Sequence, residues 1–307
     1  MIGVREKEKV MRGRSWLMIL LGLCLLTACR TEQESGEESL YSESQQDSKA
    51  EESEDPGMTS EPESSQKSEA AMHTFAVEEK QILPEIFENL LAAGYGESLQ
   101  EWVQLAEEVD LSRYEWLSQI PNPGERCFAI EGYIMPGEYE LPEKAEPREV
   151  LDILLRGWDE RMTPELRGEI DASGYSLDEI LNMASIVEWE SAYGTDAYIK
   201  PNVASVILNR LRLGMKLQMD TSIYYLKEVK KSGAKDTKPY QDAYDTYKCA
   251  ALPAGPICSP GAAAIDGVLH APDTKYLFFV WKVSTGEYFF AETWEGHKEN
   301  LKKAGIS

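Results

Sequence analysis

The sequence has few of the residues that build metal centres or disulfide frameworks. It contains 5 cysteines and 3 histidines in 307 residues, with no pair of cysteines in a C-x-x-C pattern. Structural zinc sites need four closely spaced Cys or His ligands, so we expect no metal and no cofactor. Cys249 and Cys258 are spaced so that they could pair in an oxidising compartment, or they could remain free thiols together with Cys127.

Positive charge is also scarce. The chain has 31 Lys and Arg against 54 Asp and Glu, a formal net charge of -23. Binding to nucleic acid needs clustered cations that neutralise phosphates, so we expect no nucleic-acid partner. The composition is compatible with an uncharged or weakly charged polymer such as a glycan.

Long hydrophobic runs are absent as well. An uncharged, mostly apolar run covers residues 16–28, which is shorter than the roughly 20 residues of a membrane span. It follows a basic stretch, as in a secretory signal peptide. It ends in Leu26-Thr27-Ala28-Cys29, which resembles a bacterial lipobox. We therefore expect residues 1–29 to be a lipoprotein signal, with Cys29 lipidated and the protein anchored on the extracellular side of the cell membrane. An ordinary signal peptide or a short anchor helix is the alternative.

The next segment, residues 30–74, is predicted to be a disordered tether. Residues 31–70 hold 10 Ser and 13 acidic residues and very few large apolar ones. Such a chain buries too little apolar surface to offset the entropy of ordering it.

The remaining residues predict an α+β fold with mixed helices and small antiparallel sheets. Apolar residues recur at helical spacing in several segments, and alternating or β-rich runs indicate strands. The predicted helices are 78–93, 98–108, 146–157, 163–173, 176–191 and 200–214, and the predicted strands are 132–141, 215–220, 276–282 and 287–290.

Charged residues stand on the apolar faces of two predicted helices. At 100° per residue, Glu188 falls inside the apolar face of helix 176–191, and Glu190 falls at its far edge. Arg210 falls in the middle of the apolar stripe of helix 200–214. Buried charges are costly unless they are paired or line a cleft, so Arg210 should have a carboxylate partner. The pattern fits one shared polar site and equally fits a structural ion pair.

Several blocks of sequence resemble one known family in the same order. Residues 184–190 read ASIVEWE, residues 131–139 read EGYIMPGEY, and residues 217–220 read LQMD. They are followed by YDTY at 244–247, LPAGPICSPG at 252–261 and YLFFV at 276–280. Together these blocks resemble the MltG-type, YceG-like endolytic murein transglycosylases over about residues 125–300.

The resemblance implies a lyase that cuts the β-1,4 bond between N-acetylmuramic acid and N-acetylglucosamine and leaves a 1,6-anhydro end. It places the catalytic acid on Glu188. Other positions that it implies, together with the apolar-stripe Arg210, form the predicted substrate-binding set of Asn209, Arg210, Gln218, Asp220, Tyr244 and Tyr247. For several of these the residues alone allow a structural role instead, such as an N-cap at Asp220 or a core position for either tyrosine.

The resemblance also implies a domain plan and partners. A reduced LysM-like subdomain would occupy residues 75–130, and the catalytic domain would occupy 131–307. The partners would be peptidoglycan glycan strands, the membrane through the lipid, and peptidoglycan synthases. Departures from the family pattern occur at Trp189, Met219, Thr221, Asp245 and Ser259. A glycan-binding lipoprotein that assists synthesis without cutting is the alternative function.

Overall fold

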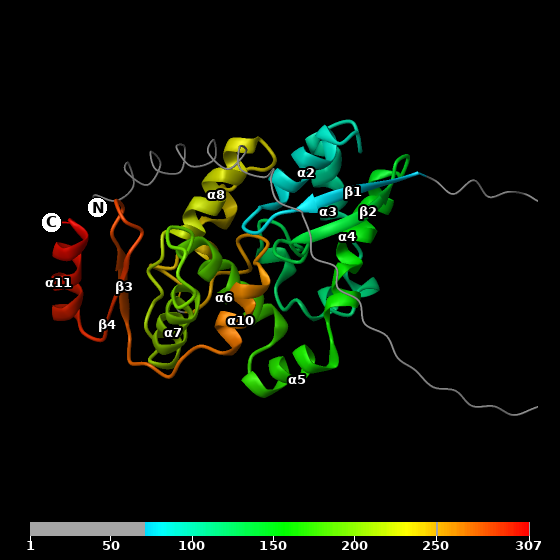
Figure 1. Cartoon of the computed structure of the whole chain (residues 1–307). Helices are drawn as coiled ribbons and strands as arrows, with labels where there is room; N and C mark the ends of the chain where they lie inside the picture. Colours follow the sequence, from blue (N-terminus) through cyan, green and yellow to red (C-terminus); the bar gives the residue numbers. More distant parts are fainter. Residues whose placement is uncertain (1–70, 250, 307) are drawn as a thin grey trace, which may run out of the picture. The chain divides into compact units, whose positions relative to one another are not determined.

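The computed structural model describes residues 71–249 and 251–306. These residues belong to one compact unit, Gln66–Ser307, which holds mixed helices and two two-stranded antiparallel sheets (Figure 1). The predicted signal, Cys29 and nearly all of the predicted tether lie outside the described residues. The helices are α2 Leu83–Ala92, α3 Leu99–Glu107, α4 Pro147–Arg161, α5 Pro164–Ser173, α6 Leu177–Glu190, α7 Ile199–Arg212, α8 Thr221–Ser232, α9 Gln241–Tyr244, α10 Ala262–Leu269 and α11 Trp294–Ala304.

The first sheet joins the start of the described chain to its middle. Strand β1 (Met72–Val77) pairs with β2 (Gly137–Pro142), with Phe75 opposite Tyr139. Helices α2 and α3 pack together, with the rings of Phe87 and Trp102 stacked at 5.5 Å. Strands from both sides of residue 130 therefore share one sheet. The predicted division into domains at residues 75–130 and 131–307 stays a prediction. The strand also begins at Met72, inside the range predicted as tether, because Phe75 and Val77 alternate as buried residues.

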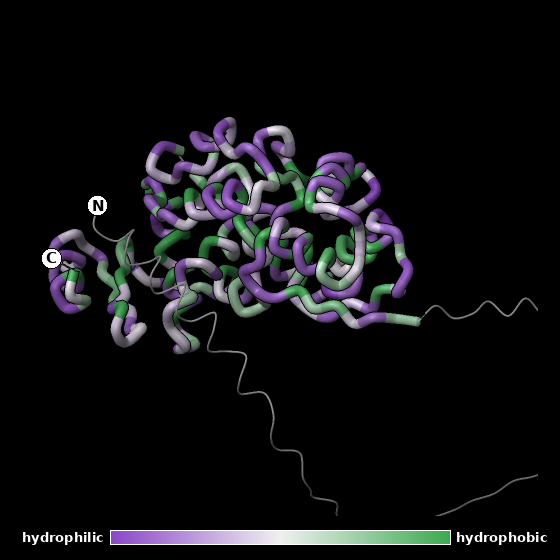
Figure 2. The backbone as a smooth tube through the Cα atoms, turned by 90° about the horizontal axis from the view of Figure 1, so that it is seen from above, coloured by the Kyte–Doolittle hydropathy of each residue, from purple (hydrophilic) through white to green (hydrophobic). Residues whose placement is uncertain are grey.

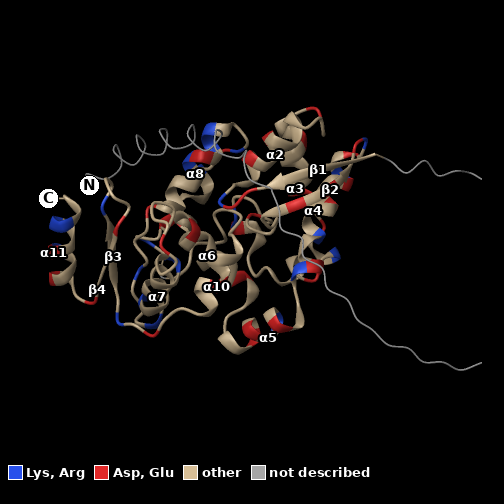
Figure 3. Ribbon diagram, viewed as in Figure 1, with Lys and Arg blue, Asp and Glu red and all other residues tan. Residues whose placement is uncertain are grey.

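Helix α6 lies among other helices. Ser176 and Glu179 form a capping box at its N-terminus, and α7, α8 and α10 contact its sides. Every residue from Ile180 to Glu190 is buried as a result. Figure 3 shows charges of both signs on α8 and on the more distant helices α4 and α5.

The C-terminal part is a hairpin with a helix beside it. Strands β3 (Phe278–Trp281) and β4 (Tyr288–Ala291) pair in antiparallel register, and α11 packs against both. Figure 2 shows apolar residues along this hairpin and within the central group of helices. Within the described part of the chain, no helix combines the length and the apolar character needed to cross a membrane.

The observed elements differ from the predicted ones at several places. Helix α2 starts at Leu83 rather than 78, because β1 runs to Val77 and a turn follows. Helix α4 continues past Gly157 to Arg161. A Cβ atom at Gly157 would stand 2.8 Å from the Tyr139 hydroxyl oxygen, so this glycine permits close packing instead of ending the helix.

Two of the predicted strands differ from the observed structure. The predicted strand 132–141 begins five residues too early, because the observed strand β2 is Gly137–Pro142. Residues 215–219 are not a β-strand. Their main chain instead forms hydrogen bonds with Thr246. Gln218 N donates to the Thr246 carbonyl at 3.1 Å, and Met219 N donates to the Thr246 hydroxyl at 2.9 Å.

Candidate functional site

The C-terminal half of α6 carries two buried carboxylates. Glu188 is 5% exposed and Glu190 is 4% exposed. Residues two positions apart on a helix point roughly 200° apart, so the two side chains meet different neighbours. The prediction that charge lies on the buried face of this helix is confirmed.

Glu188 is enclosed by hydrogen-bond donors. The ammonium group of Lys200, in the first turn of α7, donates to both Glu188 oxygens at 2.8 Å. The main-chain N–H of Gly261, the N-cap of α10, donates to Oε2 at 3.1 Å. Helix N-termini favour negative charge, and Lys200 supplies the opposite charge. Both oxygens of Glu188 are therefore already engaged.

The segment 78–81 covers this ion pair. Glu79 lies 3.7 Å from the Lys200 ammonium nitrogen and packs against Gly261, where a Cβ atom would collide with the Glu79 carboxylate. Lys80 N donates to Ser259 O at 2.8 Å, and the Lys80 ammonium group stands 4.9 Å from the centre of the Trp189 ring. Burial lowers the pKa of the Lys80 ammonium group. The Glu188 side of the helix is thus closed by local packing.

Glu190 lies among phenol groups. The Tyr288 hydroxyl donates to the main-chain carbonyl of Glu190. Burial first, and the negative charge of Glu190 second, raise the pKa of Tyr193 to about 12. Tyr247 also has a pKa raised to about 12, by burial, then by the Asp220 carboxylate, with Glu190 contributing less. These tyrosines remain protonated at neutral pH and can act as hydrogen-bond donors near Glu190.

The segment 215–220 brings two predicted site residues to the same region. Leu217 and Met219 are buried while Gln218 is exposed and Asp220 is half-buried, which confirms the predicted alternation. Gln218 has a left-handed backbone with φ of 52°, a conformation that is costly for a residue with a side chain. Asp220 occupies the N-cap position of α8, but its side chain makes no capping hydrogen bond.

The two predicted tyrosines occupy different environments. Tyr244 is fully buried, with its ring centre 5.4 Å from that of Tyr225, so it is a core residue. Tyr247 is 46% exposed and lies beside Asp220. Of the pair, only Tyr247 can meet a ligand without rearrangement of the core.

Asn209 and Arg210 hold main-chain segments together. The Asn209 side-chain amide donates to the carbonyls of Thr274 and Tyr276 at 2.9 and 3.1 Å. The Arg210 guanidinium donates to the carbonyls of Leu277 and Leu217 at 2.7 Å each, and to Gln218 Oε1 at 3.4 Å. The expected carboxylate partner of Arg210 is therefore replaced by main-chain carbonyls. The prediction failed because a helical wheel shows burial but not which group from another segment meets the side chain.

Sequence reasoning missed a further buried carboxyl group, Glu131. It is fully buried, and its two oxygens accept from Leu83 N, at the start of α2, at 3.2 and 3.3 Å. Burial raises its pKa to about 8. No periodicity marks this residue, because its environment comes from a segment 48 residues earlier in the chain.

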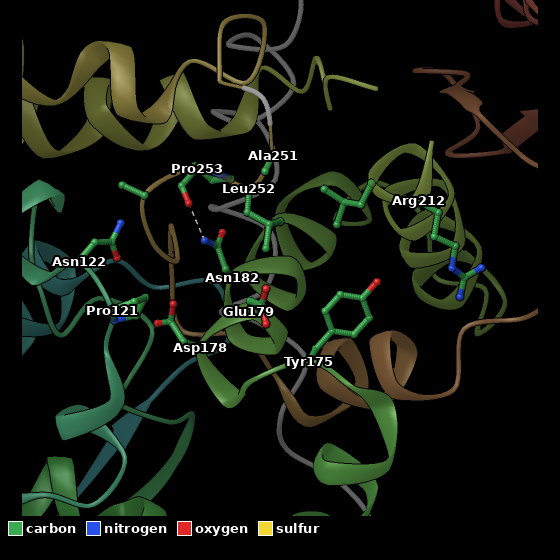
Figure 4. Close-up of a pocket in the computed structure, with 12 residues that line it drawn as sticks. Pro121, Asn122, Tyr175, Asp178, Glu179, Asn182, Arg212, Ala251, Leu252 and Pro253 are labelled. Atoms are coloured by element: carbon green, nitrogen blue, oxygen red, sulfur yellow. Dashed lines mark hydrogen bonds between the residues drawn. The ribbon is translucent and has the colours of Figure 1, made fainter. Parts of the chain in front are cut away.

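A pocket of about 420 Å³ lies beside the N-terminal half of α6 (Figure 4). It is lined by Glu179 and Asn182 of α6, by Arg212 of α7 and by the loop 251–254, among others. The Asn182 amide donates to the Pro253 carbonyl at 2.8 Å. Asp178, which also lines it, is held by Arg126 at 2.6 Å. Neither Glu188 nor Glu190 lines this pocket.

The cysteines of the described part are free thiols. Cys127 and Cys258 are buried, and Cys249 is half-buried. The alternative of a Cys249–Cys258 disulfide is therefore not realised in this structure.

Comparison with known proteins places the chain in a family. The model of the YceG-like family matches residues 55–303. The chain belongs to the YceG-like family. Among solved structures, a yceG-like protein from Listeria monocytogenes superimposes with a TM-score of 0.64 at 24% identity, covering 74% of this chain and 75% of that one. This agreement confirms the predicted fold class of mixed helices with small antiparallel sheets.

Curated YceG-like relatives carry one functional name. An endolytic murein transglycosylase of Streptococcus pneumoniae serotype 2 is 27% identical over 231 residues, covering 72% of this chain and 40% of that protein. The enzyme of the same name from Bacillus subtilis is 30% identical over 179 residues, covering 57% of this chain and 48% of that protein. The chain thus spans less than half the length of these relatives.

Proposed function

We propose that this protein is an endolytic lytic transglycosylase that cuts uncrosslinked glycan strands of peptidoglycan. Family membership supports this proposal, and so does the name shared by the curated relatives. The observation that carries it is the buried Glu190 at the end of α6, near Tyr193 and Tyr247, with Asp220 beside Tyr247.

The proposed reaction needs one acid–base group. The carboxylic acid donates its proton to the bridging oxygen while the bond from C1 of N-acetylmuramic acid to that oxygen breaks. The resulting carboxylate then takes the proton of the C6 hydroxyl, whose oxygen bonds to C1. No water is consumed, and the acid is restored. Glycosidases generally need two carboxylates, but here the hydroxyl of the substrate itself replaces the second.

Two residues compete for the acid–base role. The sequence resemblance assigns it to Glu188, whose oxygens already accept from Lys200 and Gly261. A general acid must present its proton to the leaving oxygen, so geometry is considered before pKa. We infer that Glu190 carries the acid–base role and that Glu188 holds α6, α7 and α10 together. Tyr247 and Gln218, both exposed, would contact the glycan.

We extend the proposal to the location and the partners of the protein. Lipidation of Cys29 would anchor the protein to the outer face of the cell membrane, with the residues from 30 up to the start of β1 at Met72 as the tether. The enzyme would then meet strands as peptidoglycan synthases make them, and its cuts would end their elongation. The acidic composition leaves the lipid as the main attachment to the membrane, since anionic headgroups do not attract a negative protein.

The test uses the whole chain purified in detergent and incubated with uncrosslinked glycan strands. Mass spectrometry should find shorter strands with 1,6-anhydro ends. Products with added water would identify a hydrolase instead. Intact strands in the presence of folded, glycan-binding protein would favour the alternative, a glycan-binding lipoprotein without catalysis.

A further inference from the structure

One face of the β3–β4 hairpin carries a row of aromatic rings. We define the aromatic strip as Tyr198, Tyr276, Phe279, Tyr288 and Phe290. Side chains alternate between the two faces of a strand, and Phe279, Tyr288 and Phe290 share one face through the pairing of β3 with β4. The other face belongs to α11, where Phe278 stacks on His297 at 5.2 Å.

The rings of the strip form a connected series around Phe290. Its ring centre lies 5.4 Å from that of Tyr276, 6.2 Å from that of Phe279 and 6.3 Å from that of Tyr288. Tyr198, from the N-cap of α7, adds an edge contact at 6.5 Å. The rings therefore come from three segments that meet here, and the strip is fixed by tertiary structure.

Exposure changes along the strip. Tyr198 is 45% exposed, Tyr276, Phe279 and Phe290 are half-buried, and Tyr288 is 4% exposed. The buried end reaches the site, because the Tyr288 hydroxyl donates to the Glu190 carbonyl. The strip thus runs from solvent to the residue to which we assign the acid–base role.

We propose that the aromatic strip binds the glycan strand outside the bond that is cut, as an extension of the Glu190 site. This inference rests on the proposed function. Pyranose rings have apolar C–H faces that pack against flat aromatic rings, while their hydroxyl groups stay in water. Asp196 and Glu287 contribute to raising the pKa of Tyr198, after burial, so acidic groups stand at the exposed end. An uncharged sugar chain fits this surface better than an anionic polymer does.

The strip predicts a dependence on strand length. In this proposal a long strand bound at Glu190 extends along the strip toward Tyr198, whereas a disaccharide covers less of it. Removing the outer rings should therefore weaken the binding of long chains and leave short ones unaffected. It should raise KM on long strands without changing kcat, because these contacts are equal in the ground state and the transition state.

The test measures binding by calorimetry with the whole chain in detergent. The probes are a long oligomer of β-1,4-linked N-acetylglucosamine, which lacks the bond to be cut, and its disaccharide. The double variant Tyr198→Ala, Tyr276→Ala should bind the long oligomer about tenfold more weakly, because two ring contacts with the sugar chain are lost. Tyr198→Phe should bind like the wild type, because stacking does not need the hydroxyl.

The matched control is Trp294→Ala, which removes a 51% exposed ring at the start of α11, next to Phe278 and outside the aromatic strip. Equal affinity of the wild type and the double variant for the long oligomer would overturn the proposal that the strip binds glycan. An equal loss of affinity in the Trp294→Ala control would overturn it as well. So would a folded wild type that does not bind the long oligomer. If the double variant cuts long strands with unchanged KM, the strip proposal is wrong and the transglycosylase proposal stands. If the strip variants lose binding but no protein cuts strands, the strip stands and the transglycosylase proposal fails.

Discussion

Glu188 and Glu190 stand two positions apart on α6 and are buried to nearly the same degree, yet their surroundings differ. Glu188 meets a lysine and a helix N-terminus, and residues 78–81 cover it. Glu190 lies near tyrosine hydroxyl groups, and one of these tyrosines, Tyr247, reaches solvent. Burial alone therefore does not identify a functional carboxylate, because the partners decide whether it can exchange a proton with a substrate.

The first prediction removes the acid at Glu190. Glu190→Gln keeps the size of the side chain but cannot donate and accept the proton that the reaction needs. We expect the rate of strand cleavage to fall about 10²–10⁴-fold, the usual contribution of a general acid–base group. The thermal unfolding midpoint should stay close to that of the wild type. A variant that keeps wild-type turnover would remove Glu190 from the mechanism.

The second prediction breaks the ion pair on the other side of the helix. Lys200→Met leaves the Glu188 carboxylate buried without its cation, which typically costs about 3–5 kcal/mol of unfolding free energy. Urea unfolding measures this loss. The double variant Lys200→Met, Glu188→Gln should recover a large part of it, because no unpaired charge is then buried. Equal losses in the single and double variants would contradict a pairing role for Glu188.

The third prediction concerns the buried carboxyl group of Glu131. Its pKa is raised to about 8 in the folded protein, chiefly by burial, against 4.5 as the ordinary value. The folded state therefore holds a proton that the unfolded state has lost between these two pH values. The contribution of Glu131 to the unfolding free energy is greatest below the lower value and falls by about 1.4 kcal/mol per pH unit as the pH rises toward 8.

Urea unfolding at several pH values between about 5 and 8 tests this slope. Glu131→Gln should remove it while keeping an oxygen that accepts from Leu83 N. The control Glu138→Gln changes an exposed carboxylate of β2 and should leave the slope as it is. A Glu131→Gln variant with the wild-type slope would assign the pH dependence to other groups.

The smallest predicted effect on stability concerns the backbone of Gln218, which we place in the Glu190 site. Gln218→Gly relieves a left-handed conformation, so the unfolding free energy should rise by up to about 1 kcal/mol. Glycan affinity should fall at the same time, because the side chain is lost. Lys216→Gly, at a nearby exposed position without positive φ, should destabilise instead by about 0.5–1 kcal/mol. A gain in both stability and affinity would show that Gln218 does not contact the substrate.

The sequence predicts the helices around the site well, and it predicts the contacts poorly. Helix α6 is clear because Ser176 and Glu179 cap it and its apolar residues recur at helical spacing. The same spacing shows that Glu188 and Arg210 are buried. It cannot show that Lys200 and Gly261 meet Glu188, or that carbonyls meet Arg210, because these partners come from other segments.

The elements that sequence analysis missed have weak local patterns. Strand β1 is short and only two of its residues are buried, Phe75 and Val77. Helix α11 has mostly charged and polar residues and only Asn300 and Ala304 are buried, so its apolar stripe is faint. Its Thr293 cap and the Gly305 after its end were the available signals. Helix α10 is short and begins at Gly261 without a side-chain cap.

The most direct test compares the two α6 carboxylates in one assay. Wild type, Glu188→Gln and Glu190→Gln are incubated with the same uncrosslinked strands, and 1,6-anhydro ends are counted by mass spectrometry per folded molecule. We predict that Glu188→Gln, where it is folded, keeps most of the wild-type rate and that Glu190→Gln loses it. Loss of cleavage in folded Glu188→Gln with a normal rate in Glu190→Gln would contradict the assignment of the two roles.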